Sequence, residues 1–380
     1  MTKILSSGGF VALIDEINKM RQEIRTDGYP MSVNEWASLY ENDKNKPEID
    51  VHPEFQRYYR WTPEQKSKLI ESIFLGIPIP PIFVSQRKDG VWDVVDGLQR
   101  LSTIYEFMGI LKDEEGKKVK PLVLQKTQYL PSLEGKKWDD EYDIANSLTD
   151  EERLLIKRSK ISASILLRES DEIAKYELFQ RLNTGGSSLT PQEVRNCMLV
   201  MTNREMYLWV RALSQYEKFQ EVIGLSENPL QEQYDVELAL RFIIFHNIDH
   251  AELTNLADLG LFITNKMLGM AKNPAFNKSH VESVFKDTFD LLSSSIGRNA
   301  FRRFDVGKQK FTGGFLLSPF EVVAYGLGYN YKNFPALNQI EEKVKSVWTE
   351  EEFNVNSGTG IPATRRLPRL LPIGRRIFVK

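Results

Sequence analysis

The chain has 380 residues, of which 41% are hydrophobic and 27% charged, a composition that fits a folded globular protein and excludes a disordered or fibrous one. No run approaches the roughly 18 apolar residues that a membrane helix needs, and residues 1–10 lack the apolar core of a signal peptide. We therefore expect a cytoplasmic protein with no membrane partner. The one cysteine, Cys197, excludes an intrachain disulfide and lies in an apolar pattern typical of a packed thiol.

The first part of the chain alternates helical and extended patterns. Apolar residues recur at helical spacing over residues 10–24, and Ser32 with Glu35 forms a capping box that predicts a second helix. Residues 50–57 favour a short strand. Residues 62–65 (Thr-Pro-Glu-Gln) combine a capping threonine, a first-position proline and a third-position glutamine, so they predict the start of a third helix.

A hairpin and a turn follow this helix. Prolines keep residues 77–81 extended, because each proline disfavours helix at the residue before it. Residues 82–86 and 91–95 flank an Asp-Gly pair and predict a β-hairpin. The second strand leads directly into Asp96-Gly97-Leu98-Gln99-Arg100, and a helical pattern continues over residues 101–108.

Residues 109–150 are polar and are expected to form a peripheral insertion with one or two strands. Residues 161–167 predict a returning strand, which is followed by a helical pattern over residues 170–182 and a loop composition over residues 183–188. Residues 190–193 (Thr-Pro-Gln-Glu) repeat the helix-start signal.

Beyond residue 195 the pattern is mainly helical. Apolar periodicity predicts helices at residues 198–213, 236–245, 256–267, 281–296, 319–327 and 340–348. This order of elements predicts an α+β fold. We expect a mixed domain over residues 1–200 and a mainly α-helical domain with a basic C-terminal tail over residues 201–380.

The segment around Asp96 has the clearest chemical character. Gly97 allows the backbone to approach a ligand closely, and the helix start after it presents amides and a positive dipole end to phosphate. Arg100 adds a fork of donors that matches phosphate oxygens, and Asp96 suits a divalent cation or an oriented water. The alternative is a surface Asp-Gly turn with ordinary polar residues.

Two further segments have the character of ligand-binding sites. Residues 55–61 place Arg57 and Arg60 among four aromatic side chains, which suits stacking on a base and gripping phosphate. Packed aromatics at a strand end are the alternative. Residues 179–186 end in a polar, glycine-rich turn between two helical patterns, which is either a ligand loop or an ordinary connection.

Together these segments resemble the GmrSD-type N-terminal family, a ParB/sulfiredoxin-like fold of DNA restriction and antiphage systems. The resemblance covers about residues 30–200 and depends on the order and spacing of several motifs. They are Phe55-Gln56-Arg57 with Trp61, Gly76-Ile77-Pro78-Ile79-Pro80, Asp96-Gly97-Leu98-Gln99-Arg100-Leu101-Ser102-Thr103, and Phe179-Gln180-Arg181-Leu182-Asn183-Thr184-Gly185-Gly186 leading to Leu189-Thr190. The family's usual core is Asp-Gly-Gln-Gln-Arg, so Leu98 replaces its first glutamine here.

The resemblance implies an NTPase that binds and hydrolyses a nucleoside triphosphate within a restriction or antiphage system, with Mg²⁺ as cofactor. Asp96, Gln99 and Arg100 would be catalytic, and Asp96 would hold the metal. The residues assigned to the nucleotide are Gln56, Arg57, Arg60, Gly97, Ser102, Thr103, Asn183, Thr184, Gly185 and Gly186. A ParB-like fold also favours a homo-oligomer.

Two basic clusters suggest DNA as a further partner, although the net charge of −2 gives no overall attraction to it. Residues 361–380 carry six cations and no acid, and residues 298–310 carry five cations against Asp305 alone. The residues assigned to DNA are Arg302, Arg303, Arg365, Arg366, Arg369, Arg375 and Arg376. Solvated surface charge is the alternative.

Two other functions stay open at this point. The first is a nucleotide-gated DNA-binding regulator that does not hydrolyse nucleotide, which Leu98 and the basic clusters favour. The second is a metal-dependent nuclease in which Asp96 and a carboxylate such as Glu71 share a metal. His246 and His250 have no third ligand nearby, so ordinary histidines are expected. With four histidines and one cysteine, the chain itself lacks an HNH nuclease pattern, and a separately encoded nuclease is expected as partner.

Overall fold

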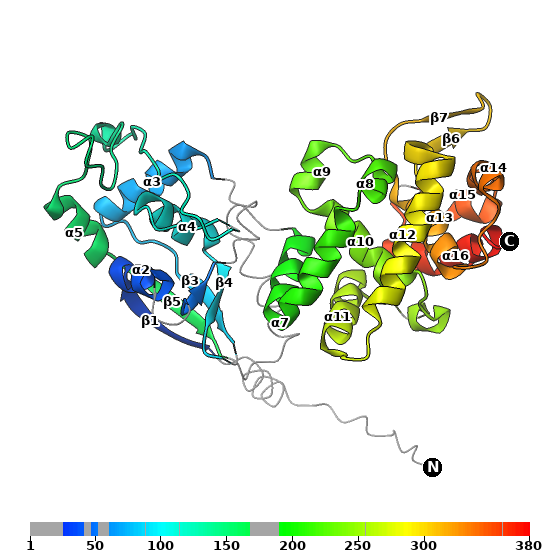
Figure 1. Cartoon of the computed structure of the whole chain (residues 1–380), viewed down its shortest axis with the longest axis horizontal. Helices are drawn as coiled ribbons and strands as arrows, with labels where there is room; N and C mark the ends of the chain where they lie inside the picture. Colours follow the sequence, from blue (N-terminus) through cyan, green and yellow to red (C-terminus); the bar gives the residue numbers. More distant parts are fainter. Residues whose placement is uncertain are drawn as a thin grey trace, which may run out of the picture. The chain divides into compact units, whose positions relative to one another are not determined.

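The computed structural model of the chain describes residues 26–41, 47–51, 61–87, 89–113, 115–167, 190–254, 256–358 and 360–380. By its internal contacts the chain divides into two compact units, Met1–Ser188 (unit 1) and Leu189–Lys380 (unit 2) (Figure 1). The α+β class expected from the sequence is confirmed, since a mixed sheet in unit 1 is followed by helices in unit 2. No helix among the described residues is long and apolar enough to cross a membrane.

A five-stranded mixed sheet forms the frame of unit 1, in the order β1-β5-β3-β4-β2. The strands are β1 (Thr26–Ser32), β2 (Ile49–Asp50), β3 (Ile82–Gln86), β4 (Trp92–Asp96) and β5 (Lys160–Leu166). The predicted hairpin is confirmed, because β3 and β4 pair antiparallel, whereas β3 and β5 pair in parallel. Strand β3 therefore has a partner on each side, and its Ile82 and Val84 side chains are buried in the hydrophobic core of this unit.

Helices pack with this sheet around one hydrophobic core. In the described part of unit 1 they are α2 (Val33–Glu41), α3 (Pro63–Phe74), α4 (Leu98–Phe107) and α5 (Asp150–Arg158). The two capping boxes expected in unit 1 are present. The amide of Ser32 donates to the Glu35 carboxylate at 2.6 Å, and the amide of Thr62 donates to Oε1 of Gln65 at 2.9 Å. The starts of α2 and α3 are thus set by local chemistry.

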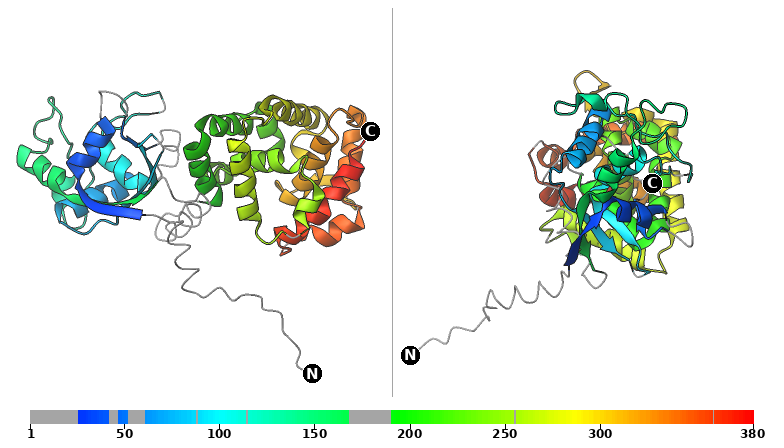
Figure 2. Two further views of the ribbon diagram at one scale, coloured as in Figure 1. Left: turned by 90° about the horizontal axis from the view of Figure 1, so that it is seen from below. Right: turned by 90° about the vertical axis from the view of Figure 1, so that its left-hand side faces the viewer.

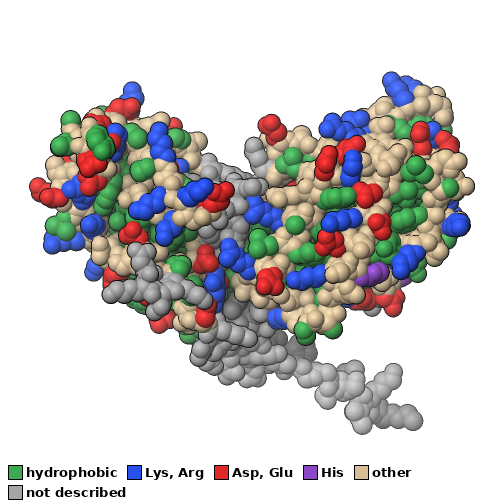
Figure 3. All heavy atoms as spheres, viewed as in Figure 1, with side chains coloured by type: hydrophobic (Ala, Val, Ile, Leu, Met, Phe, Trp, Pro, Cys, Tyr) green, Lys and Arg blue, Asp and Glu red, His purple; other side chains and the backbone are tan. Residues whose placement is uncertain are grey.

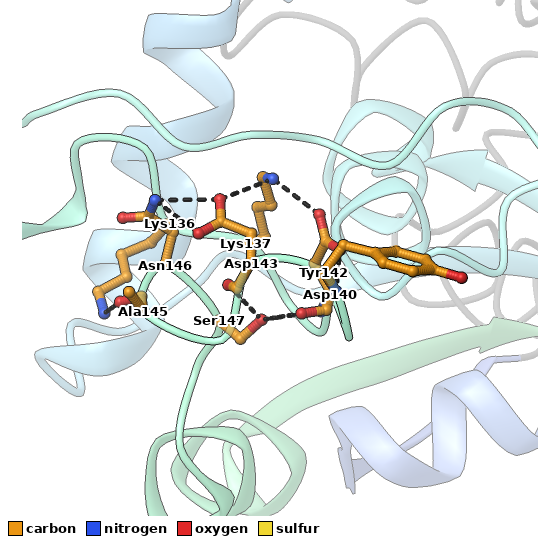
Figure 4. Close-up of polar contacts among 8 residues, drawn as sticks. All are labelled: Lys136, Lys137, Asp140, Tyr142, Asp143, Ala145, Asn146 and Ser147. Carbon is orange, nitrogen blue, oxygen red and sulfur yellow. Dashed lines mark hydrogen bonds and ion pairs between the residues drawn. The ribbon is translucent and has the colours of Figure 1, made fainter.

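The expectation of one or two strands between residues 109 and 150 is wrong for the residues described there. They form isolated bridges, Lys112–Lys118 and Lys137–Ser147, and a short 3-10 helix. Figure 4 shows Lys137 between two carboxylates, with its Nζ 2.7 Å from Asp140 and 2.9 Å from Asp143. In the same segment the amide of Asp140 donates to the Ser147 hydroxyl at 2.8 Å, and this hydroxyl lies 3.1 Å from the carbonyl oxygen of Asp143. Hydrogen bonds between side chains and the backbone offer the backbone an alternative to a strand ladder.

Unit 2 is mainly helical. Its described helices are α7 (Pro191–Ser214), α8 (Glu217–Ile223), α9 (Glu227–Gln231), α10 (Tyr234–Phe245), α11 (Leu259–Lys272), α12 (Lys278–Ser295), α13 (Leu317–Tyr329), α14 (Leu337–Val347), α15 (Glu351–Asn356) and α16 (Ala363–Ile377). The six helices predicted there are present as α7 and α10 to α14, with shifted ends. Residue 200, where the sequence suggested a domain boundary, lies inside α7, and Cys197 is half-buried on the same helix.

A short antiparallel hairpin interrupts the helices of unit 2. It consists of β6 (Arg303–Asp305) and β7 (Lys310–Thr312). The hairpin lies between α12 and α13 in the chain, and Figure 1 shows it extending from the helical body of this unit.

The C-terminal residues form a packed helix where the sequence suggested a basic tail. Helix α16 lies against α13, as the views of unit 2 in Figures 1 and 2 show. Its buried apolar residues are Leu367, Leu370, Leu371, Ile373 and Ile377. Gly374 and Gly326 allow the two backbones to touch, because a Cβ on either glycine would overlap the backbone of the other helix.

Two internal prolines explain why this helix is hard to predict. Pro368 and Pro372 lie inside α16, and a proline normally breaks a helix because it lacks an N–H for the carbonyl four residues earlier. Pro372 leaves the carbonyl of Pro368 without that bond. Nε2 of His250 lies 2.8 Å from this carbonyl oxygen and, since the oxygen can only accept, donates to it. A hydrogen bond from a distant part of the chain thus gives the Pro368 carbonyl the partner that the helix cannot supply.

Candidate nucleotide site

The turn between β4 and α4 is built around Gly97. Its φ of 99° lies in the left-handed region, which glycine adopts without strain. A Cβ at this position would overlap Cδ1 of Ile82 on the neighbouring strand β3. The sheet therefore approaches the turn so closely that glycine is required both for conformation and for space.

Arg100 holds the turn in place. Its Nη2 donates to Oδ2 of Asp96 at 2.7 Å, and its Nη1 donates to the carbonyl oxygens of Pro80 at 2.5 Å and Pro81 at 3.0 Å. The side chain is 12% exposed. The sequence suggested that this guanidinium binds phosphate, but the structure directs it to three oxygens of the protein itself. Arg100 thereby positions Asp96 and joins the turn to the proline-rich segment.

Asp96 is the accessible acid of this turn, with 41% of its side chain exposed. It lies at the end of β4, two residues before the start of α4. Among the described residues no side chain caps this helix start. The positive end of the α4 dipole and an accessible carboxylate therefore lie side by side, an arrangement that suits a phosphate accompanied by a divalent cation.

The other predicted residues on α4 have different surroundings. Oε1 of Gln99 accepts a hydrogen bond from the amide of Trp61 at 3.4 Å, which connects α4 to the residues before α3. The Thr103 hydroxyl donates to the carbonyl of Gln99 at 2.7 Å. Ser102 and Thr103 are fully buried. These two residues therefore face the interior of unit 1, while Asp96 faces outward.

Seven of the residues assigned to the nucleotide lie outside the described residues. They are Gln56, Arg57, Arg60, Asn183, Thr184, Gly185 and Gly186. The predicted helices at residues 10–24 and 170–182 also lie there.

Sequence reasoning missed the carbonyls of Pro80 and Pro81 as partners of the site. Their bonds to Arg100 fix the orientation of the guanidinium toward Asp96. The signal for them is the extended proline run directly before β3, because the residues that enter a strand lie beside the end of its antiparallel neighbour.

The described residues offer Asp96 no cluster of acids or histidines for a metal. No group of three or more His, Cys, Asp or Glu side chains comes together in this part of the chain. Glu71, considered as a second metal ligand, is buried, and its Oε1 accepts from the amides of Tyr129 at 2.9 Å and Leu130 at 3.0 Å. Burial raises the pKa of Glu71, but hydrogen bonds from Thr127 and these amides outweigh it and leave the pKa lowered. Glu71 therefore has the surroundings of a charged structural residue.

The two spaced histidines also have structural partners. His246 follows the end of α10 and is buried, with Nδ1 3.0 Å from the carbonyl oxygen of Phe242. Burial lowers the pKa of His246, so its neutral form is favoured. His250 lies on the next short 3-10 helix and supports α16 through Pro368.

Most of the arginines of α16 that were assigned to DNA have partners inside unit 2. Arg366 forms a two-pronged ion pair with Glu321, at 2.8 and 2.9 Å. Arg369 donates to Asn356, Arg375 to the carbonyl of Ile248, and Arg376 to Glu350. The exceptions among the assigned residues are Arg365, which is exposed on α16, and Arg302 and Arg303 at the β6–β7 hairpin.

Comparison with known proteins adds one finding. Residues 37–200 match the family model described as the N-terminal domain of the GmrSD restriction endonuclease. The matched segment contains the Asp96 turn, Arg100 and the proline-rich segment, so it includes the whole described part of the site. No curated protein and no solved structure matches the chain.

Proposed function

We propose that this chain binds a nucleoside triphosphate at the Asp96 turn and hydrolyses it. The match of residues 37–200 to the GmrSD N-terminal domain indicates a component of a restriction or antiphage system. One observation carries the proposal. The accessible Asp96 carboxylate, held by Arg100, lies beside the uncapped start of α4. A helix start favours phosphate, and a carboxylate next to it favours the cation that accompanies a nucleotide.

The residues present fit Mg²⁺ that arrives with the nucleotide. Magnesium is commonly held by one or two carboxylates together with substrate phosphates and water, so Asp96 alone suffices on the protein side. When bound, the ion neutralises charge on the phosphoryl oxygens.

The chain's own residues perform the positioning. The start of α4 would hold phosphate oxygens, and Gly97 allows the tight turn that leads from β4 into this helix start. Arg100 keeps Asp96 in one orientation through its bonds to Pro80 and Pro81. Phosphoryl transfer depends mainly on positioning and charge stabilisation, so a small set of fixed groups can support it.

A second function is favoured by Leu98. This residue occupies the first position of α4, where the family's usual core has glutamine, and its side chain packs against the hydrophobic core of unit 1. It offers no hydrogen-bonding group to a nucleotide. A nucleotide-gated DNA-binding regulator without hydrolysis therefore remains the second candidate. In either case we propose DNA as the system's target and a separately encoded nuclease as partner.

Nucleotide binding tests the site before turnover is considered. The Asp96→Asn variant keeps an oxygen acceptor for Arg100 but loses the charge that holds the cation. With Mg²⁺ present, we expect its Kd for the preferred nucleotide to rise at least about tenfold, which is about 1.4 kcal/mol. Isothermal titration with ATP, GTP, CTP and UTP measures this.

The matched control is Asp139→Asn, which removes the same charge from an exposed aspartate of unit 1, 68% exposed. This variant should bind as the wild type does. Equal affinity of the Asp96→Asn variant and the wild type would place the nucleotide elsewhere.

A further inference from the structure

Unit 2 has two basic clusters, and they differ in whether the protein itself occupies their charges. The cluster on α16 is largely committed to Glu321, Glu350, Asn356 and a backbone carbonyl. The cluster at the β6–β7 hairpin is not. Within the described part of the chain, the cations of the hairpin that form no ion pair are Arg302, Arg303 and Lys310. Uncommitted cations are the ones available to an external polyanion.

The register of the hairpin places its charges on one face. Phe304 pairs with Phe311, and their rings lie 5.0 Å apart on the face that is partly buried. Side chains alternate between the two faces of a ribbon. Arg303 and Lys310, each one residue away, therefore share the opposite face, and both are exposed.

The tip of the hairpin is ordered by its own hydrogen bonds. Oδ1 of Asp305 accepts from the amide of Lys308 at 3.0 Å, and Nε2 of Gln309 donates to the carbonyl of Val306 at 2.7 Å. The side chain of Lys308 is 71% exposed. Figure 3 shows lysine and arginine side chains at the upper right edge of the molecule, where Figure 1 draws the hairpin. The ribbon thus presents its cations from a defined structure.

We propose that the β6–β7 hairpin, with Arg302 at its base, is a contact surface for the phosphate backbone of duplex DNA. Four cations (Arg302, Arg303, Lys308 and Lys310) and the carboxylate of Asp305 give this surface a local charge of +3, although the whole chain has a charge of −2. Lysine and arginine bind duplex DNA by replacing counterions at phosphates, and a two-stranded ribbon fits the major groove. The choice of DNA rests on the proposed role in a restriction system, whereas the site is independent of the Asp96 turn.

The salt dependence of DNA binding tests this surface. The affinity of the full chain for a fluorescent duplex is measured from about 50 to 200 mM salt, without nucleotide or Mg²⁺. Each lost phosphate contact lowers the log–log slope by about 0.9, so Arg303→Ala/Lys310→Ala should lower it by about 2. The Kd at about 0.1 M salt should rise roughly tenfold or more for the same reason.

A control double variant distinguishes the loss of a specific DNA contact from a general effect of lower positive charge on DNA binding. Lys118→Ala/Lys120→Ala removes two exposed lysines from unit 1 and should leave the slope unchanged. An equal loss in both double variants, or no loss in the hairpin variant, would overturn the proposal. So would stronger competition by RNA than by duplex DNA. Arg303→Gln/Lys310→Gln should lower the slope as the alanine variant does, while its thermal unfolding stays that of the wild type.

The same assay distinguishes this surface from the nucleotide site. The Asp96→Asn variant should bind duplex DNA as the wild type does, because the measurement contains no nucleotide. The hairpin variant should keep its nucleotide affinity. Loss of DNA binding in Asp96→Asn would contradict the independence of the two sites, and failure of nucleotide binding alone would leave the hairpin as a DNA contact.

Discussion

Replacing Glu321 with alanine is expected to lower the free energy of unfolding of the chain by about 3–5 kcal/mol, the cost of removing one partner from a buried ion pair. Glu321 is 0% exposed and accepts from Nε and Nη2 of Arg366 at 2.8 and 2.9 Å. Without it, Arg366 keeps its charge in a partly buried position on α16. The substitution also removes support from Arg241.

Arg241 cannot lose its charge by deprotonation when Glu321 is replaced. Burial lowers the pKa of Arg241, but the nearby carboxylates of Glu237 and Glu321 outweigh burial and keep the pKa above its ordinary value. An arginine stays protonated under all ordinary conditions. Removal of Glu321 therefore leaves cations with fewer partners in the interior of unit 2, which lowers the free energy of unfolding.

Chemical denaturation of the full chain measures this prediction. Glu342→Ala is the matched control, because Glu342 is 75% exposed and forms a surface ion pair with Lys345 at 2.7 Å. Surface pairs contribute little, so the control should change the free energy of unfolding by less than about 1 kcal/mol. A Glu321→Ala variant as stable as this control would contradict the structural role of the pair.

A second large effect is expected where α13 and α16 touch. Gly374→Ala places a Cβ against the carbonyl of Val322 and the Cα of Gly326, which are backbone atoms that cannot rotate away. The helices must separate, and we expect a loss of about 3 kcal/mol, the upper part of the range for overpacking. Thermal and chemical unfolding of the purified variant measure it.

A glycine in open space gives the opposite result. Gly269 lies inside α11, is exposed, and a Cβ there would meet nothing within 4 Å. Because alanine favours helix over glycine, Gly269→Ala should raise the free energy of unfolding by about 0.5–1 kcal/mol. The same substitution should therefore have opposite signs at residues 374 and 269. Equal effects of the two substitutions would show that α13 and α16 do not touch at Gly374.

Local signals in the sequence predicted much of the fold. The capping boxes at Ser32, Thr62 and Thr190 depend on residues three apart, and each marks the start of a helix in the structure. The β3–β4 hairpin likewise depends on a short turn. The glycine of the Asp96 turn was predictable for the same reason, since its φ is a property of one residue.

The features of the site that the sequence did not predict depend on contacts between residues far apart in the chain. Arg100 was expected to bind phosphate because its guanidinium is a good phosphate donor, but the carbonyls of Pro80 and Pro81, about twenty residues earlier, accept from it. Ser102 and Thr103 were assigned to the nucleotide by their place after the motif, while the rotation of α4 against the core buries them.

Helix α16 is the clearest case of a contact that overrides local preference. Its prolines and arginines are typical of an exposed segment, yet His250 and Glu321 supply partners from other helices. The periodic leucines at residues 367, 370 and 371 carried the correct signal, because they mark one apolar side of a helix. Charge density alone was therefore a poor guide to which arginines face an external partner.

The release of phosphate by the pure protein tests the central claim most directly. ATP, GTP, CTP and UTP are each incubated with Mg²⁺, with and without duplex DNA, beside the Asp96→Ala variant. We predict release from at least one nucleotide and a fall of at least about 100-fold in the variant, the effect expected when a group that stabilises the transition state is lost. Equal release by both proteins would contradict an NTPase site at the Asp96 turn.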